Sequence, residues 1–368
     1  MKIKWVFCTI LIFLSVLKIQ TNLQAAAASQ INNILNKTVL TEQDKQIIDD
    51  YIRETINALL NENNLSKIAR HREVILSRKG SQVQYVQQFN ESTEKYITEA
   101  FNTIKTLKPA EKQSIIAANL LILIDKLENI QFAIPAMNLL EDKNIVVRYW
   151  AVQCLTNPNI IARLNSGQAS NPNLPQEITA KFKSIVPGSS PEILNSIARY
   201  AAGINITQGE ELLLQIADQR IRSYADWSIK LEYIDTNLLK LIESKISNPS
   251  DKTDVSALAR RFAQLYSYAI QRYAAGFDTL NSIQKAQLAT LIVEIEDKCI
   301  KNMTGSQQTL RKALETEQLQ ALMAEHNILL GSDTAQGKLP LKYKFNYGRT
   351  DTGSARTAPQ LLPRQNQQ

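Results

Sequence analysis

Hydrophobic residues recur every three or four positions along most of the chain, from Ile47 to Leu329. This spacing places them on one face of an α-helix, whereas the strict alternation typical of a half-buried strand is hard to find over the length of a strand. The pattern therefore predicts an all-α fold. We expect helices over residues 41–61, 65–78, 81–107, 109–128, 133–141, 144–156, 176–186, 191–203, 208–222, 223–246, 254–276, 282–301 and 307–326.

Residues at the starts of these segments support the helical interpretation. Thr41 stands three positions before Asp44, and Thr207 stands three positions before Glu210. This is the spacing of a capping box, in which two side chains each bond a main-chain N–H that the helix leaves free. Pro191 occupies the first turn of its predicted helix, where its missing N–H costs nothing.

Polar stretches divide the predicted helices into two regions. Residues 165–175 are rich in Asn, Ser, Gly and Pro, which favour loops. We predict an N-terminal helical region over 29–166 and a C-terminal helical region over 176–330. The apolar period then stops, and Gly, Pro, Gln, Thr and Arg take over, so we expect residues 331–368 to form a flexible basic tail without a packed core.

The first residues have the composition of a secretory signal peptide. Lys2 and Lys4 precede an apolar run over 5–17, which is shorter than the roughly 20 residues that span a bilayer. Small residues at 25–29 then satisfy the cleavage pattern. We predict that residues 1–28 are a signal peptide, with an uncleaved anchor as the alternative, and that the chain is exported to the periplasm, the cell surface or the extracellular space. No transmembrane segment is expected after cleavage.

The net charge of +7 is concentrated at the two ends of the chain. Cleavage of the signal peptide removes three lysines and leaves +4. From residue 338 onward six basic residues accompany one acid, which makes that end +5 and leaves the body almost neutral at −1. The body therefore gives no electrostatic reason to expect a nucleic-acid partner, whereas the basic end could bind an anionic polymer or a membrane surface.

The helix pair predicted over 133–156 has a small residue, Ala151, where two helices would approach closely, and Val147 on the stripe that would be buried. This segment covers 24 of the 368 residues and resembles a HEAT repeat. The resemblance implies an α-solenoid of stacked antiparallel helix pairs. The polar break over 165–175 would divide it into two helical subdomains. It also implies that Asp142 and Arg148 belong to a structural ladder between adjacent repeats.

A short sequence recurs within the chain. Residues 197–204 read IARYAAGI and residues 270–277 read IQRYAAGF, an offset of 73 residues, or about two helix pairs. Each copy contains an Arg-Tyr pair, and these residue types are enriched at protein interfaces. The alternative is that the tyrosines are half-buried and the arginines form the ladder. The candidate interaction surface consists of Tyr149, Arg199, Tyr200, Arg272 and Tyr273.

Residues that bind metals or carry redox chemistry are scarce. The chain has two histidines: His71 is flanked by arginines, and His326 lies near the end of the last predicted helix, where the helix dipole favours it. Neither has a second ligand at metal-binding spacing. Cys154 and Cys299 remain after cleavage and are expected either as two helix-buried thiols or as a pair. We expect no metal and no cofactor.

Grouped acidic residues are the remaining candidates for catalysis, because an acid and a base across a cleft can cleave a glycan. Helix capping and solvation explain these groups better, so no catalytic residue is assigned. The groups are Glu210 with Glu211, Asp49 with Asp50, and Glu294 with Glu296 and Asp297.

Taken together, these patterns predict an exported, non-catalytic helical-repeat scaffold that mediates protein–protein interaction in the cell envelope, with a protein partner that the sequence does not identify. One alternative is an all-α glycan-active hydrolase or lyase that uses paired carboxylates. Another is a binder of anionic polymer or of a membrane surface through the basic C-terminal tail.

Overall fold

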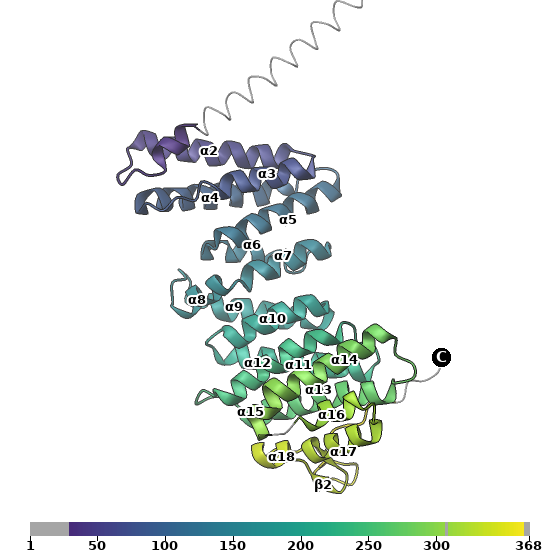
Figure 1. Cartoon of the computed structure of the whole chain (residues 1–368). Coiled ribbons are helices and arrows are strands. Elements are labelled where there is room, and N and C mark those ends of the chain that lie inside the picture. The colour runs from purple at the N-terminus through teal and green to yellow at the C-terminus, as the bar shows by residue number, and fades with distance from the viewer. Residues whose placement is uncertain (1–28, 306–307, 364–368) are drawn as a thin grey trace, which may run out of the picture. The chain divides into compact units, whose positions relative to one another are not determined.

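The computed structural model describes residues 29–305 and 308–363 (Figure 1). Within these residues, regular structure is almost entirely helical, which confirms the all-α fold class. No helix in this part of the chain is both long and apolar enough to cross a membrane. The predicted signal peptide, residues 1–28, lies outside the described residues.

The chain divides into two compact units, Met1–Cys154 and Leu155–Gln368. The division precedes the polar break that we expected over 165–175. The reason is a short helix that the periodicity did not indicate, α8 (Pro158–Asn165), which packs against α10 (Pro191–Gly203) and therefore belongs to the second unit.

The first unit is built from helices that pack against their neighbours in sequence and one beyond. In this unit α2 contacts α3 and α4, and α5 contacts α3 and α4. The helical faces that meet are those that the apolar period marked, and they bury large side chains such as Ile52, Tyr85 and Phe89. Its elements are α2 (Glu42–Asn61), α3 (Leu65–Leu76), α4 (Val83–Ile104), α5 (Ala110–Leu127), η1 (Ile130–Phe132), α6 (Ala133–Met137) and α7 (Ile145–Leu155).

One of the two predicted capping boxes is present. At the start of α2 the Thr41 side chain accepts from the N–H of Asp44, and the Asp44 carboxylate accepts from the N–H of Thr41. The second is wrong: α11 begins at Thr207 with no side-chain cap, and Glu210 instead accepts from the N–H of Asp254 at 2.9 Å. Glu210 therefore holds the loop that precedes α13 and not the start of its own helix.

In the second unit, α13 is the central helix. It contacts α11, α12, α14, α17 and α18, so its side chains are buried on nearly every face. The remaining elements of this unit are α9 (Leu174–Ile185), η2 (Val186–Gly188), α11 (Thr207–Ala225), η3 (Glu232–Ile234), α12 (Asp235–Ser247), α13 (Val255–Ala275), α14 (Ser282–Ile295), the π-helical turn η4 (Glu296–Ile300), α15 (Lys301–Thr304), α16 (Thr309–Glu315) and α17 (Leu319–Leu330).

The single helix that we expected over 223–246 does not form. Instead α11 continues to Ala225, a loop follows, and α12 begins at Asp235. Trp227 and Leu231 in this loop have positive φ angles of 56° and 53°, which a helix does not contain. Buried ionic contacts of Arg220 and Arg272 hold the loop in this conformation.

Residues 331–363 are folded, in contrast to the flexible basic tail that we expected over 331–368. After α17 come a small antiparallel hairpin, β1 (Gly331–Ser332) with β2 (Ala335–Gln336), and helix α18 (Lys338–Tyr343), which packs on α13 and α17. Leu339, Phe345 and Tyr347 are buried. These apolar side chains follow no helical period, so the sequence pattern did not reveal that they pack. Residues 364–368 lie outside the described part.

Candidate functional site

Three polar side chains lie on one face of the central helix α13. Gln264, Ser267 and Gln271 are separated by three and four positions, which places them in one stripe. Their exposed fractions are only 7%, 0% and 7%. A buried amide or hydroxyl without a hydrogen-bond partner costs about 1–3 kcal/mol, so these groups require partners.

The two glutamines bind the main chain of the C-terminal segment, which we define as residues 357–363. The Gln264 side chain donates from Nε2 to the carbonyl of Gln360 (3.2 Å) and accepts at Oε1 from the N–H of Gln360 (2.8 Å). The Gln271 side chain donates to the same carbonyl (3.1 Å) and accepts from the N–H of Leu362 (2.7 Å). Each side-chain amide therefore accepts through its oxygen and donates through its NH₂ group, as the main-chain groups of neighbouring strands do in a sheet.

The C-terminal segment lies on the protein as an irregular stretch without helix or turn from Pro359 to Pro363. Ala358 and Pro359 are buried, and Leu362 is half-buried. The Gln360 side chain is exposed, and Leu361 is 77% exposed. The main chain therefore supplies the hydrogen bonds, and only some of the side chains face the protein.

Both ends of the segment are held as well. At its start the Thr357 hydroxyl donates to the carbonyl of Ser332 (2.7 Å). At its far end the indole Nε1 of Trp227 donates to the carbonyl of Pro363 (2.8 Å). We call Trp227, Gln264 and Gln271 together the tail-binding site.

A polar relay behind the site orients Gln271. Its Nε2 also donates to Ser267 Oγ (2.8 Å), which lies 2.8 Å from His326 Nε2, and His326 Nδ1 lies 2.9 Å from Asn327 Oδ1. Burial lowers the pKa of His326, although the bond to Asn327 opposes this, so the ring is neutral at pH 7. His326 is thus a buried hydrogen-bonding residue, whereas we expected it to face a helix dipole.

The relay also assigns the tautomer of His326 and the orientation of the Gln271 amide. Because Asn327 Oδ1 can only accept, the ring proton is on Nδ1, and Nε2 must accept from the Ser267 hydroxyl. The Ser267 oxygen is then free to accept from the NH₂ group of Gln271. This leaves the carbonyl oxygen of Gln271 for Leu362.

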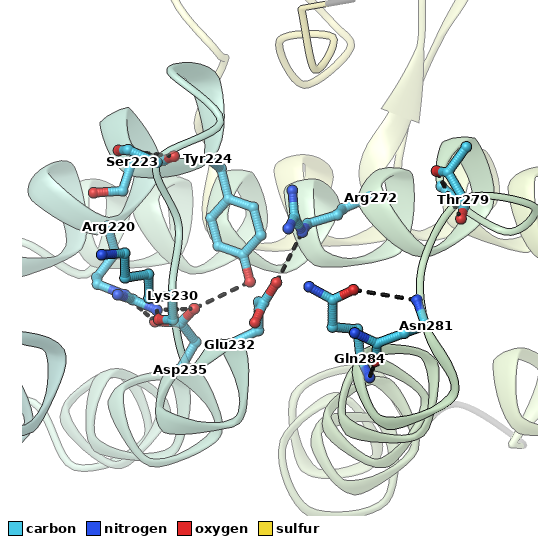
Figure 2. A network of polar contacts seen from close by, with 12 residues as sticks. Arg220, Ser223, Tyr224, Lys230, Glu232, Asp235, Arg272, Thr279, Asn281 and Gln284 are labelled. Carbon is cyan, nitrogen blue, oxygen red and sulfur yellow. Dashed lines mark hydrogen bonds and ion pairs between the residues drawn. The ribbon is translucent and has the colours of Figure 1, made fainter. Parts of the chain in front are cut away.

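A buried ionic network fixes the loop between α11 and α12 (Figure 2). Arg220 binds Asp235 with two hydrogen bonds, at 2.6 and 2.9 Å, and also donates to the carbonyl of Lys230 at 3.1 Å. The Tyr224 hydroxyl donates to the same carboxylate at 3.1 Å. Arg220 and Asp235 are only 3% and 1% exposed. Burial raises the pKa of Asp235, and the charge of Arg220 counters this rise.

The second ion pair of this network reaches the tail-binding site. Glu232 accepts from Arg272 Nε at 2.9 Å, and both residues are buried (Figure 2). The Arg272 guanidinium in turn lies 5.3 Å from the ring centroid of Trp227, a distance at which a cation and an aromatic face attract. Glu232 therefore positions Arg272, and Arg272 positions the indole that binds Pro363.

The residues of the candidate interaction surface have different environments. In the first unit, Tyr149 is half-buried, with its ring edge-on to Trp150. In the second, Tyr200 is fully buried, and its hydroxyl donates to the carbonyl of Pro175. Arg272 and Tyr273 are also buried, whereas Arg199 is exposed. In the second unit these residues therefore do not share a solvent-exposed face, and only Arg272 contributes to the tail-binding site.

Arg148 and Asp142 contact the turn between α6 and α7. Arg148 donates to the main-chain carbonyls of Asp142 (2.7 Å) and Lys143 (3.2 Å), while the Asp142 carboxylate accepts from the N–H of Asn144 (2.7 Å). These bonds are local to the helix pair. The ladder between adjacent repeats remains a prediction.

The grouped acids are engaged in structural contacts. Asp49 accepts from Ser92 and Tyr96, Asp50 pairs with Arg53, Glu211 pairs with Lys183, and Glu294 pairs with Lys240. Glu296, which is 1% exposed, accepts from the N–H groups of Leu310 and Arg311 and so caps α16, while Asp297 pairs with Arg311. Within residues 29–305 and 308–363, no three His, Cys, Asp or Glu side chains cluster as metal ligands would.

Sequence reasoning missed the tail-binding site, although one signal was available. Gln264, Ser267 and Gln271 form a polar stripe on the strongly apolar 254–276 helix, and each polar side chain that is buried there must find a hydrogen-bond partner. The partner lies 96 residues further along for Gln264, in a segment without periodicity. No local pattern connects the two.

The fold and the site together define an all-α protein whose own C-terminal segment lies along its central helix. No protein-family model, curated protein or solved structure matches the chain.

Proposed function

We propose that this protein is an exported, non-catalytic helical scaffold that mediates protein–protein interaction in the cell envelope. The observation that supports it is the way in which Gln264 and Gln271 bind the main chain of residues 357–363. A helical framework that satisfies both the N–H and the C=O groups of a polypeptide can accept extended segments in general.

Main-chain binding is a recurrent solution for peptide recognition. When a peptide adds to a sheet edge, main-chain hydrogen bonds give affinity and side-chain pockets give specificity. Here the side-chain amides of one helix take the place of the sheet edge. The relay through Ser267 and His326 holds Gln271 in one orientation before a peptide arrives, which reduces the entropy lost on binding.

Capture from an envelope extract, followed by rebinding with purified components, tests this function. The captured protein is purified, and its dissociation constant is measured with the wild-type chain and with a variant carrying Gln264→Ala and Gln271→Ala. We expect the double variant to bind at least tenfold more weakly, since four hydrogen bonds to the main chain are lost.

The matched control carries Gln176→Ala and Gln208→Ala, which remove two exposed helical glutamines of the same unit. This control should bind as the wild type does. Equal binding by the tail-binding-site variant and the control, or turnover of an envelope glycan by the purified chain, would contradict the proposed function.

A further inference from the structure

We infer that residues 357–363 are a built-in occupant of a peptide-binding site on α13, and that this site accepts from a partner protein an extended, uncharged segment of the same chemistry. The inference rests on the proposed function and names its partner class and its regulation. In the structure the site is closed in cis, and a partner segment must displace the tail.

The hydrogen-bonding pattern defines which main-chain groups a partner must offer. The site accepts N–H groups at the positions of Gln360 and Leu362, and it donates to the carbonyls at Gln360 and Pro363. The chain places proline, which has no N–H, at 359 and 363, where the site has no need of a donor. The two prolines thus fall in register with the bonding pattern.

The side chains of the segment show which positions are selective. Pro359 is buried and Leu362 is half-buried, so a partner requires a compact residue at the first position and an apolar one at the second. Gln360 and Leu361 point their side chains toward solvent, so these positions tolerate substitution. The segment from Thr357 to Pro363 carries no charge. The fitting sequence is therefore proline, two free positions, leucine and proline.

The indole of Trp227 adds selectivity at the far end. An aromatic ring with a polar N–H is the usual partner of proline-containing extended peptides, because it offers a flat apolar face and a donor for the carbonyl. Trp227 has both features. Its ring is oriented by the guanidinium of Arg272, which in turn donates a hydrogen bond to Glu232.

The segment is attached so that it can leave while the core stays packed. Before the segment, the buried Tyr347 hydroxyl donates to the carbonyl of Leu330, and main-chain hydrogen bonds join Arg356 to Tyr347 and Gly348. The first residue of the segment, Thr357, donates to the carbonyl of Ser332. Beyond Thr357 the described chain contributes only Ala358 and Pro359 as buried residues. Release of residues 358–363 therefore exposes little apolar surface.

Attachment in cis sets how strongly the tail competes. A segment on a short flexible tether has an effective concentration of about 1 mM. If the isolated segment binds with a dissociation constant of about 100 µM, the tail occupies the site about 90% of the time and weakens a competing peptide about tenfold. A partner must exceed this affinity.

The test uses the full-length chain and a fluorescent peptide, acetyl-Thr-Ala-Pro-Gln-Leu-Leu-Pro-amide, with binding followed by anisotropy. An opened variant, Gln360→Pro with Leu362→Pro, removes the two N–H donors of the tail and frees the site without shortening the chain. We expect the peptide to bind this variant about tenfold more tightly than it binds the wild type. Leu361→Ala, a change at an exposed position, is the matched control and should bind as the wild type does.

A second measurement depends on the peptide and does not require a folded variant. N-methylation of the peptide at the positions of Gln360 and Leu362 removes both donors and should abolish binding, whereas methylation at Leu361 should be tolerated. In the wild-type chain, excess unmodified peptide should also speed hydrogen exchange at the chain's own Gln360 and Leu362 amides.

Equal binding of methylated and unmodified peptide, or no effect of Gln264→Ala with Gln271→Ala in the opened variant, overturns the inference. A wild-type chain that dimerises with concentration by exchange of tails overturns the choice of a partner protein. If the captured partner binds through Gln264 and Gln271 but the peptide does not, the scaffold function stands and the inference fails. If neither binds through these residues, both fail.

Discussion

The orientation of the buried Gln271 side chain depends on hydrogen bonds with several other residues. The oxygen of its side-chain amide accepts from Leu362 and the NH₂ group donates to Gln360 and Ser267, and the hydrogen bonding of Ser267 in turn depends on which ring nitrogen of His326 carries the proton. A buried network in which every donor and acceptor is satisfied stabilises one arrangement and penalises all others. Protonation of His326 should therefore lower the stability of the second unit.

We expect the stability of the chain to fall as the pH is lowered below about 6.5, the ordinary pKa of histidine. Burial lowers the pKa of His326 in the folded state, so below this pH the unfolded chain binds a proton that the folded chain does not. The contribution of His326 to stability is therefore complete above pH 6.5 and declines as the pH falls, by at most about 1.4 kcal/mol per pH unit.

Urea denaturation at several pH values, with wild type and His326→Gln, measures this dependence. The variant should show a smaller decline between pH 7 and pH 5. The chain's other histidine, His71, also has a pKa lowered by burial, so His71→Gln is the matched control and should remove only its own share. An identical pH dependence in wild type and His326→Gln would contradict the proposed relay.

Gly331 is the residue whose backbone brings the tail into place. Its φ of +113° is favourable only for glycine, and a Cβ there would lie 2.2 Å from the carbonyl oxygen of Thr357. We expect Gly331→Ala to cost about 1–3 kcal/mol from strain alone and to loosen the tail in addition. Hydrogen exchange at Leu362 should accelerate.

The matched control for this change is Gly348→Ala. Gly348 has a similar φ of +103°, but a Cβ there meets no atom within 4 Å. This control should carry the cost of strain and leave the exchange of Leu362 unchanged. Similar exchange rates in the two variants would mean that the contact between Gly331 and Thr357 does not anchor the tail.

At the scale of elements, the joint between α11 and α12 is held by ionic contacts and not by turn residues. The apolar period continues through 223–246, which is why the sequence predicted one helix there. The chain instead bends at the loop so that Arg220 can reach both Asp235 and the carbonyl of Lys230. The ion pair between Arg220 and Asp235, which are 15 residues apart, therefore outweighs the local preference for a continuous helix.

We expect Asp235→Asn to destabilise the second unit by about 3–5 kcal/mol, because it leaves the buried charge of Arg220 without its counter-charge. Denaturant unfolding followed by circular dichroism measures the loss. The control is Asp218→Asn, which breaks the partly exposed pair with Arg261 and should cost no more than about 1 kcal/mol. Equal losses would show that the buried pair does not hold the joint.

At the scale of the whole molecule, the sequence predicted what depends on local order and missed what depends on distant partners. The helical class and most helices follow from the apolar period, and the Thr41 cap follows from a spacing of three. The folding of residues 331–363 does not follow from local order, because Leu339, Phe345 and Tyr347 have no helical period and α18 packs on α13 and α17. The HEAT-like arrangement of the helices and the export of the chain remain predictions.

The two described thiols should be unreactive in the native protein. Cys154 and Cys299 are free and buried, and burial raises the pKa of Cys299 to about 12, so almost no reactive thiolate is present at pH 8. A thiol reagent should label neither cysteine before denaturation and both after it, and a reductant should leave the melting temperature unchanged. A melting temperature that falls on reduction would indicate a disulfide.

The order of synthesis gives the position of the C-terminal segment a further consequence. The ribosome completes Gln264 96 residues before Gln360, which corresponds to about 5–20 s of translation. During that interval α13 emerges with its amides still hydrated. A nonsense mutation at the codon for Thr357 would therefore release a protein that lacks residues 357–363, its own competitor, and such an allele should behave as a gain of binding.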